Sequence, residues 1–385
     1  MTQLMLPCPV LSFLLVAGLV AQPPQSGASE TKFDELSRRA AAVLQSDPAE
    51  AVRLYRQALA IRPSSAEDCF YLAAGLYGNS QYAESRKAFQ RAAALAPKNG
   101  AVWAFLGLCE YRINDYAQAL SDIQKGEVLR LPDDRDFLSK VRNCAALIYL
   151  RSSDFGSAIQ QLKPLAKIGD DSPTTILAFG VSALTLPYLP SSVPADKKAM
   201  VELAGRAEWT LCADGVADPK PLFQQLAEQY PNESSVHYLY GIYLLRRDPA
   251  LARAEFQKEL SIAPAHVSAR LQIAILDIKA GNAQSAVTLA NEALKLQPDN
   301  PLSHAVLGRA FVYMDQYAKG IPELEIAAKL APQNLQLHFS LAQAYRRVGR
   351  NADARKEAEK FERLKSLQGP MVPMEDATDM GQNPP

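Results

Sequence analysis

Three prolines in the C-terminal half of the chain, Pro264, Pro298 and Pro332, are spaced 34 residues apart. Each closes a similar phrase, such as Ala-Leu-Lys-Leu-Gln before Pro298, and Pro63 and Pro97 repeat the interval near the N-terminus. A fixed period of this length is typical of arrays in which one helix-turn-helix unit stacks on the next. The period constrains the fold strongly, because each unit can bury its apolar face only against its neighbours.

Small residues recur where the two helices of one unit would cross closely. If the closing proline is position 32 of a 34-residue unit, positions 8, 20 and 27 of the unit ending at Pro332 hold Gly308, Gly320 and Ala327. The same three positions of the preceding unit are all alanines. We therefore expect close helix crossings at these positions, and a large side chain there would force the helices apart.

The N-terminal half shows the same pattern. After Pro97 the chain has Trp103, Leu106 and Gly107, followed by Ala119 in the next apolar segment. This spacing resembles the tetratricopeptide repeat, whose consensus begins Trp-x2-Leu-Gly-x2-Tyr, although Glu110 replaces the tyrosine. The resemblance covers about residues 33–365. It implies an all-α fold, a right-handed α-solenoid of stacked helix-turn-helix repeats.

The distribution of prolines and of the repeat pattern divides the chain into segments. Three prolines between residues 187 and 194 prevent a continuous helix and enlarge one turn. The expected segments are a signal peptide or N-terminal anchor at 1–21, a linker at 22–32, an N-terminal repeat array at 33–169, a degenerate repeat with an enlarged Pro-rich turn at 170–231, a C-terminal array with a capping helix at 232–365, and a disordered tail at 366–385.

The run from Val10 to Ala21 is apolar and uncharged. It is shorter than the ~20 residues that a membrane-spanning helix needs, and it matches the apolar region of a secretory signal peptide. No lysine or arginine precedes Lys32, so the usual positive N-terminal region is missing. We expect an exported protein, periplasmic or extracellular and without membrane insertion after cleavage, with an uncleaved N-terminal anchor as the alternative.

Charge and cysteine content narrow the function classes further. The chain has 41 Lys and Arg against 41 Asp and Glu, a balance that gives no electrostatic reason to expect a nucleic-acid partner. The cysteines at 69, 109, 144 and 212 stand in apolar helical contexts and show no CxxC spacing. We interpret them as buried apolar residues, and leave their pairing open.

The chain lacks the sequence motifs of common catalytic, cofactor and metal sites, including HExxH, GxSxG, the Walker loop and GxGxxG. His237, His304 and His338 all fall at position 4 of their units, the position of the consensus tryptophan. We interpret them as packing residues in place of tryptophan rather than as a metal-binding row. No catalytic residue, cofactor or metal is expected, and the protein is not expected to be an enzyme.

By family resemblance, positions 2, 5, 9 and 12 of the first helix in each unit line a concave face. Such a groove, apolar and aromatic with arginines at its edge, suits an amphipathic helix or an extended peptide. An equally weighted alternative is that these side chains pack between neighbouring first helices. The candidate peptide-binding residues are Phe70, Tyr77, Leu108, Tyr111, Tyr238, Ile242, Leu245, Leu271, Ile275, Phe339 and Arg346.

These observations together predict a scaffold or adaptor that binds a protein or peptide partner outside the cytoplasm. A first alternative is a substrate-recognition or accessory subunit of an envelope enzyme complex, and a second is an enzyme with an unrecognised site. No lysine stands at position 5 of any unit, so the carboxylate grip of the chaperone-binding members of this family is not expected. The oligomeric state stays open.

Overall fold

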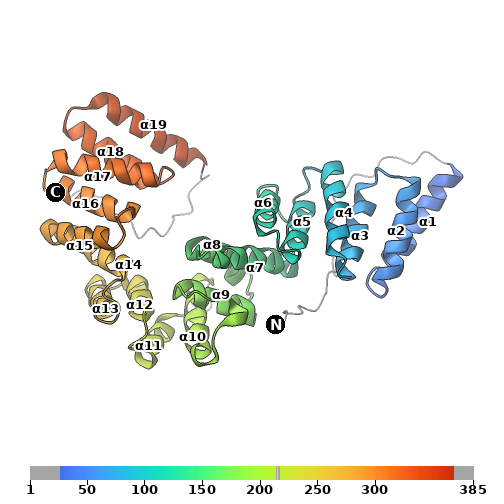
Figure 1. Ribbon diagram of the computed structural model, residues 1–385, viewed down its shortest axis with the longest axis horizontal. Coiled ribbons are helices and arrows are strands. Elements are labelled where there is room, and N and C mark those ends of the chain that lie inside the picture. The colour runs from blue at the N-terminus through green and yellow to red at the C-terminus, as the bar shows by residue number, and fades with distance from the viewer. Residues whose placement is uncertain (1–26, 214, 216, 368–385) are drawn as a thin grey trace. The chain divides into compact units, whose positions relative to one another are not determined.

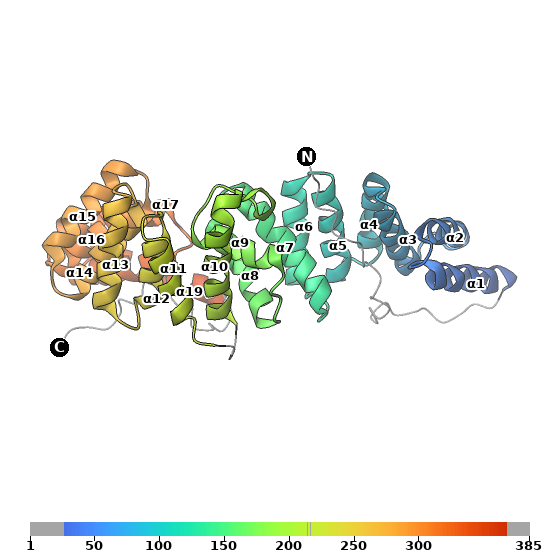
Figure 2. The same cartoon turned by 90° about the horizontal axis from the view of Figure 1, so that it is seen from below.

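The computed structural model describes residues 27–213, 215 and 217–367, and within these ranges every regular element is helical. The expected signal segment at 1–21 lies outside the described residues, as does the expected tail from residue 368 onward. The described part divides between Leu222 and Phe223 into two compact units. Figures 1 and 2 show the helices of each unit following one another side by side in chain order.

The N-terminal unit is a succession of five antiparallel helix pairs, and each helix packs mainly against its sequence neighbours. The pairs are α1 (Ala28–Val43) with α2 (Pro48–Ile61), α3 (Ala66–Gly78) with α4 (Tyr82–Leu95), α5 (Gly100–Arg112) with α6 (Tyr116–Val128), α7 (Arg135–Arg151) with α8 (Phe155–Lys167), and α9 (Pro173–Ala183) with α10 (Ala195–Cys212). A single 3-10 turn, η1 (Pro190–Ser192), lies in the enlarged connection between α9 and α10.

The C-terminal unit repeats the same arrangement in four further pairs. They are α12 (Val236–Leu244) with α13 (Pro249–Ile262), α14 (Val267–Lys279) with α15 (Ala283–Leu296), α16 (Pro301–Tyr313) with α17 (Tyr317–Leu330), and α18 (Leu335–Arg347) with α19 (Asn351–Leu367). A lone helix, α11 (Lys220–Gln229), precedes them across the division between the units. The expected all-α fold of stacked repeats is thus confirmed.

Two details of the segments differ from the sequence-based expectation. Helix α1 begins at Ala28, inside the range 22–32 where we expected a linker. Its first turn carries Glu30, which pairs with Arg62 at the end of α2 and so holds this turn against the first repeat. Helix α19 ends at Leu367, inside the range 366–385 where we expected a disordered tail.

Local sequence sets where the helices begin and turn. Side chains at the N-cap accept a backbone N–H in several helices, including Ser65 before α3 and Asn300 before α16. The turn between the two helices of a repeat has a residue with positive φ at one constant position, which is the left-handed conformation that ends many helices. The residues at this position are Ser80, Asn114, Ser153, Gly281, Asp315 and Gly349.

The close crossings expected from the small residues are present. A Cβ atom added to Gly308 would lie 2.8 Å from the carbonyl oxygen of Gly320, and one added to Gly107 would lie 2.7 Å from that of Ala119. The degenerate repeat has the same feature, because a Cβ on Gly180 would meet the carbonyl oxygen of Val201. These contacts confirm the positional alignment of the repeats.

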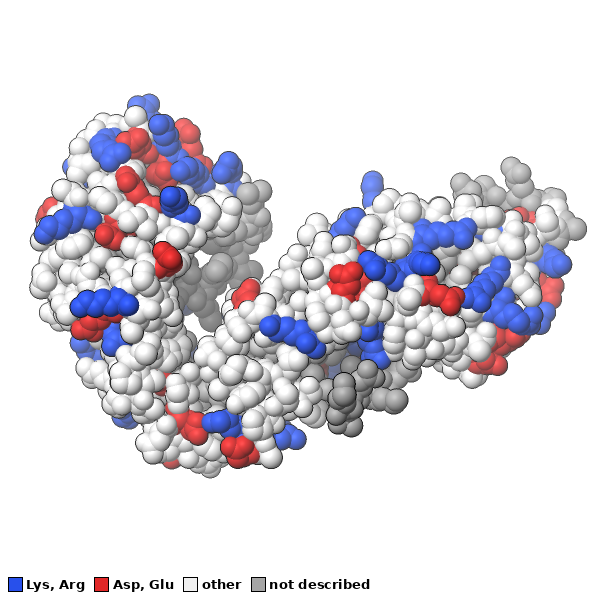
Figure 3. Space-filling view, viewed as in Figure 1, with Lys and Arg blue, Asp and Glu red and all other residues white. Residues whose placement is uncertain are grey.

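Charged side chains of both signs are interspersed over the face drawn in Figure 3, in keeping with the balanced composition. No helix in the described part of the chain combines the length and the hydropathy needed to traverse a lipid bilayer.

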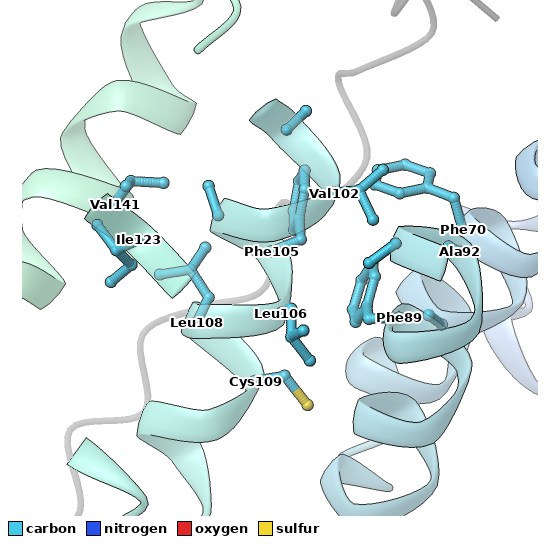
Figure 4. Packing of buried hydrophobic residues seen from close by; sticks show 14 of the residues in the cluster. Phe70, Phe89, Ala92, Val102, Phe105, Leu106, Leu108, Cys109, Ile123 and Val141 are labelled. Carbon is cyan, nitrogen blue, oxygen red and sulfur yellow. The ribbon is translucent and has the colours of Figure 1, made fainter. Parts of the chain in front are cut away.

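The core is continuous along the N-terminal repeats because aromatic side chains of successive first helices contact one another. Phe70 of α3 lies 5.2 Å from Phe105 of α5, which lies 4.7 Å from Phe137 of α7, measured between ring centroids. Figure 4 shows Phe105 between the helices, close to Phe89 of α4. Of the four cysteines within the described residues, Cys212 is half-buried and the other three are buried without a disulfide, so the packing interpretation holds for these three.

Candidate protein-interaction face of the first helices

The first helices of neighbouring repeats approach one another more closely than the second helices do. In the N-terminal unit α5 packs against α7 and α7 against α9, and in the C-terminal unit α14 packs against α16 and α16 against α18. Among the described second helices, only α8 and α10 pack together to a similar degree. Closer spacing on one side makes that side concave, so the first helices line the inner face of each unit.

Four of the eleven candidate peptide-binding residues are buried in the core. Phe70 and Leu108 belong to the apolar cluster of the N-terminal unit, and Leu271 and Ile275 belong to that of the C-terminal unit. The first helices lie so close together that side chains at positions 5 and 9 fill the space between them. For these four residues the structure corrects the expectation of a groove lining, and the alternative of packing between first helices applies.

Five candidates are half-buried and keep part of their surface on the inner face. They are Tyr77, Tyr111, Tyr238, Ile242 and Leu245. Tyr238 is the most enclosed of the aromatic ones, since its ring lies 4.7 Å from that of His266 and 5.8 Å from that of Phe256. Burial raises the pKa of its phenol. Tyr238 therefore acts mainly in packing, with an accessible edge.

The two remaining candidates, Phe339 and Arg346, are exposed on α18. Phe339 keeps 36% of its surface accessible although its ring lies 5.6 Å from that of Phe361. No further first helix follows α18 among the described residues, so position 5 of this repeat is not covered as it is in the others. An accessible aromatic and a cation therefore lie on the inner side of the last helix pair.

The structure also shows contacts between neighbouring repeats, at the end of a first helix, that were not among the candidates. Arg112 stacks on Tyr82, and Arg151 stacks on Tyr116, with the guanidinium carbon 4.8 and 4.5 Å from the respective ring centroids. Both arginines are the last residue of a first helix, and both tyrosines begin the second helix of the preceding repeat. The recurrence of arginine and tyrosine at those two positions was the signal in the sequence.

The histidines at position 4 pack in the place of the consensus tryptophan, as expected. The Nε2 atoms of His304 and His338 each lie 2.9 Å from the carbonyl oxygen of the proline six residues earlier. Trp103 makes the same contact through its indole Nε1, 2.9 Å from the carbonyl oxygen of Pro97. The ring nitrogen thus ties each first helix to the end of the previous repeat.

One buried acid of a first helix lies beside an arginine of the preceding repeat. Glu110, which replaces the consensus tyrosine, is fully buried with its Oε1 atom 3.2 Å from Nε of Arg86. Burial, with the neighbouring Asp122 as a second cause, raises the pKa of Glu110 to about 8. Within the described residues no cluster of three or more His, Cys, Asp or Glu side chains is arranged to hold a metal ion.

One open pocket of about 520 Å³ lies at the turn between α14 and α15, away from the candidate residues. Its lining includes Arg253, Asp277, Ser285 and Tyr313. Asp277 already accepts from Arg253 and from Ser285, so its carboxylate is satisfied within the fold. The pocket contains no accessible acid and base that could act together on a substrate.

Comparison with known proteins agrees with the repeat architecture. A model of the middle TPR-like domain of cilia and flagella-associated protein 70 matches residues 201–365, and a tetratricopeptide repeat model matches residues 72–133. The heat-shock protein cognate co-chaperone sgt12 of Aspergillus fumigatus is 31% identical over 107 residues, which cover 28% of this chain and 31% of the relative. The chain thus matches about a third of the length of this relative.

Two solved structures are similar in part. The solved chain of MamA from Desulfovibrio magneticus RS-1, which begins at its residue 41, has 20% identity and a TM-score of 0.39, covering 46% of this chain and 99% of that chain. Yeast Tom70 has 14% identity and a TM-score of 0.31, covering 88% of this chain and 92% of Tom70. Likenesses at these TM-scores carry no argument about what this chain does.

Proposed function

The chain belongs to the tetratricopeptide repeat family, and from this premise we propose that it is a non-enzymatic scaffold that binds a protein or peptide through the inner face of its first helices. Repeats of this kind extend a binding surface by stacking and leave function to the side chains on that surface. The inner face here carries aromatic and cationic side chains, which are enriched where protein interfaces gain most of their free energy.

The accessibility of Phe339 and of Arg346, which lies about two turns further along α18, carries this proposal. A solvent-accessible phenylalanine costs free energy that is recovered when a partner covers it, at about 25 cal/mol for each Å² of apolar surface removed from water. The arginine offers a charged contact at the edge of the same helix. Together they fit an apolar side chain of a partner and a polar group next to it.

The test is capture of a partner by the full-length chain in the native cell, with variants on each side of the C-terminal unit. We expect the Phe339→Ala/Arg346→Ala variant to lose the partner that the unchanged chain retains. The matched control is Ile326→Ala/Leu330→Ala, which removes two exposed apolar side chains from the second helix α17. Equal retention by both variants, at unchanged thermal stability, contradicts the proposal.

We further propose that this scaffold acts outside the cytoplasm. The support is the uncharged apolar run from Val10 to Ala21, which has the length of the apolar region of a signal peptide. Mass spectrometry of the N-terminus of the native protein tests this. An N-terminus at or shortly after residue 22 is expected, and a native protein that begins at Met1 and fractionates with the cytosol contradicts it.

A further inference from the structure

Tyrosines and arginines form a repeating contact beside the turns between the helices of the N-terminal repeats. In its first step, Tyr77 at the end of α3 packs edge-on against Tyr82 at the start of α4, with ring centroids 5.2 Å apart. Arg112 of α5 stacks on the ring of Tyr82 and donates a hydrogen bond from Nη2 to the Tyr82 hydroxyl. All three side chains are half-buried and keep accessible surface.

The next repeat builds the same step. Tyr111 at the end of α5 packs against Tyr116 at the start of α6, with ring centroids 5.5 Å apart. Arg151 of α7 stacks on Tyr116 and interacts with the Tyr111 phenol. We call the six residues Tyr77, Tyr82, Arg112, Tyr111, Tyr116 and Arg151 the Tyr–Arg ladder. Because each step uses equivalent positions, the two guanidinium groups are offset by one repeat.

Neither ladder arginine has a carboxylate within 4 Å among the described residues, although the chain as a whole has as many acids as bases. Some other arginines of the same unit are paired with a carboxylate. Arg56 pairs with Glu84 and Arg142 with Glu127. The ladder therefore presents two positive charges that the fold leaves uncompensated.

The C-terminal unit offers a direct comparison. Arg350 stacks on Tyr345 with its guanidinium carbon 4.3 Å from the ring centroid, much as the ladder arginines stack on their tyrosines. Arg350 nevertheless lies 2.8 Å from Asp353 and 3.7 Å from Glu325. Stacking on a tyrosine thus occurs in this protein with the charge satisfied internally, and the ladder differs in lacking the acids.

We propose that the Tyr–Arg ladder binds an extended acidic segment of a partner protein, with two carboxylates about three residues apart and apolar side chains between them. This inference rests on the proposed function and adds the chemical class of the partner and a second contact region. The carboxylates would be bound by Arg112 and Arg151, and the apolar side chains would cover the tyrosine rings.

The chemistry of the ladder supports this partner. A guanidinium group has five N–H donors in a planar fork, and bidentate pairing with a carboxylate is its strongest common interaction. Arg112 uses one donor on Tyr82 and keeps the others available. Stacking fixes the plane of each guanidinium before the partner arrives, which reduces the entropy lost on binding.

The expected spacing follows from the repeat. The helices that carry Arg112 and Arg151, α5 and α7, pack against each other, and packed helices lie about 8–10 Å apart. A segment in the extended polyproline II conformation advances about 3.1 Å per residue and has three residues per turn, so side chains three positions apart point to the same side. Two carboxylates three positions apart in such a segment therefore match the two arginines.

The test uses the full-length chain and a fluorescein-labelled peptide in which two glutamates stand three positions apart among leucine and alanine. Its control is the same peptide with both glutamates replaced by glutamine. We expect the acidic peptide to bind at least about 10-fold tighter than the control, and Arg112→Gln/Arg151→Gln to remove this difference. Arg350→Gln, the matched control variant, is expected to bind the acidic peptide as the unchanged chain does.

Circular dichroism and thermal unfolding establish that each variant is folded, and Arg112→Lys/Arg151→Lys provides a second variant that keeps the charge without the fork. Equal affinity for the two peptides, or an unchanged affinity in Arg112→Gln/Arg151→Gln, overturns the inference. So does a self-associated chain in sedimentation experiments that becomes monomeric in the same variant, since a second copy would then occupy the ladder. If the native partner is lost in Phe339→Ala/Arg346→Ala but kept in the ladder variant, only this inference fails and the proposed function stands.

Discussion

The imidazole Nδ1 atom of His237 lies 2.6 Å from the Oε2 atom of Glu255, and the Nε2 atom of the same ring lies 3.0 Å from the carbonyl oxygen of Pro231. Both ring nitrogens therefore face acceptors, and the ring is best satisfied when it is doubly protonated and positively charged. Two later repeats have the same arrangement, in His304 with Glu323 and His338 with Glu357. We call this contact of one histidine with a glutamate and a proline carbonyl the histidine clasp. It joins the two helices of one repeat to the end of the previous repeat.

We expect this clasp to make the stability of the C-terminal unit depend on pH. The hydrogen bond to Glu255 raises the pKa of His237, so its contribution is fully present below the ordinary value of 6.5 and is lost as the pH rises through the raised value. The pKa of Glu255 is lowered in the folded state, mainly by His237 and Lys258 against the effect of burial. Its contribution is present above 4.5 and is lost as the pH falls through the lowered value.

Glu255→Gln should therefore destabilise the protein most between about pH 4.5 and 6.5, by roughly 1.5–3 kcal/mol, the usual value for a hydrogen bond to a charged group. Urea unfolding at pH 6 and pH 9 measures this. The control is Lys258→Ala, because this lysine lies 2.7 Å from Glu255 but makes no contact with His237. A loss from Glu255→Gln that is the same at both pH values contradicts the assignment of the clasp.

We expect the carboxylate of Glu110 to change stability with pH in the opposite direction to that of Glu255. Burial first, and then Asp122, raises the pKa of Glu110 to about 8 in the folded protein, whereas Arg86 acts in the other direction. Because the pKa of Glu110 is higher in the folded than in the unfolded protein, the free energy of unfolding decreases as the pH increases from about 4.5 to about 8 and then levels off. Glu110→Gln should remove this fall, so its thermal midpoint should exceed that of the unchanged chain at pH 9 by more than at pH 5.

The variant keeps the neighbouring ion pair, in which Nη2 of Arg86 lies 3.2 Å from Oδ2 of Asp115. This ion pair serves as an internal control. If the pH dependence of the midpoint were unaltered by Glu110→Gln, another group would have to account for it.

A methyl group at the helix crossing of the repeat formed by α16 and α17 should destabilise the protein. In Gly308→Ala the new Cβ would lie 2.8 Å from the carbonyl oxygen of Gly320 and 3.0 Å from the backbone nitrogen of Leu324, so the two helices must move apart. We expect a cost of about 1–3 kcal/mol, typical of overpacking. The matched control is Gly156→Ala in α8, where the nearest atom is 3.9 Å away and a helix-forming residue should be neutral or stabilising.

Urea unfolding of the two glycine variants gives the comparison. Equal stability of Gly308→Ala and Gly156→Ala would mean that the crossing is looser than its glycines indicate.

The fold was predictable because the features that define it repeat. The period of Pro264, Pro298 and Pro332 and the small residues at Gly107 and Gly308 fix the packing of each helix pair from the sequence alone. The role of the position-4 histidines was predictable for the same reason, since one packing site recurs in several repeats.

The binding face was predictable only in part. The positions that face inward in each repeat can be counted from the sequence, but how deeply they are buried depends on how closely neighbouring first helices approach. That distance depends on tertiary packing. The sequence therefore places Leu271 correctly on the inward-facing side of its helix, but does not show that this side chain is buried. The Tyr–Arg ladder was missed because each of its steps joins two repeats.

The central claim is that this chain binds its partner through first helices rather than second helices, and site-specific photo-crosslinking in the native cell tests it most directly. A photoreactive phenylalanine analogue placed at Phe339 or at Tyr111 lies on first helices, whereas the same analogue at Ile326 or Leu251 lies exposed on second helices. We expect the same partner band from both first-helix positions and none from the second-helix positions. A partner that crosslinks from Ile326 and Leu251 but not from Phe339 and Tyr111 would contradict the account.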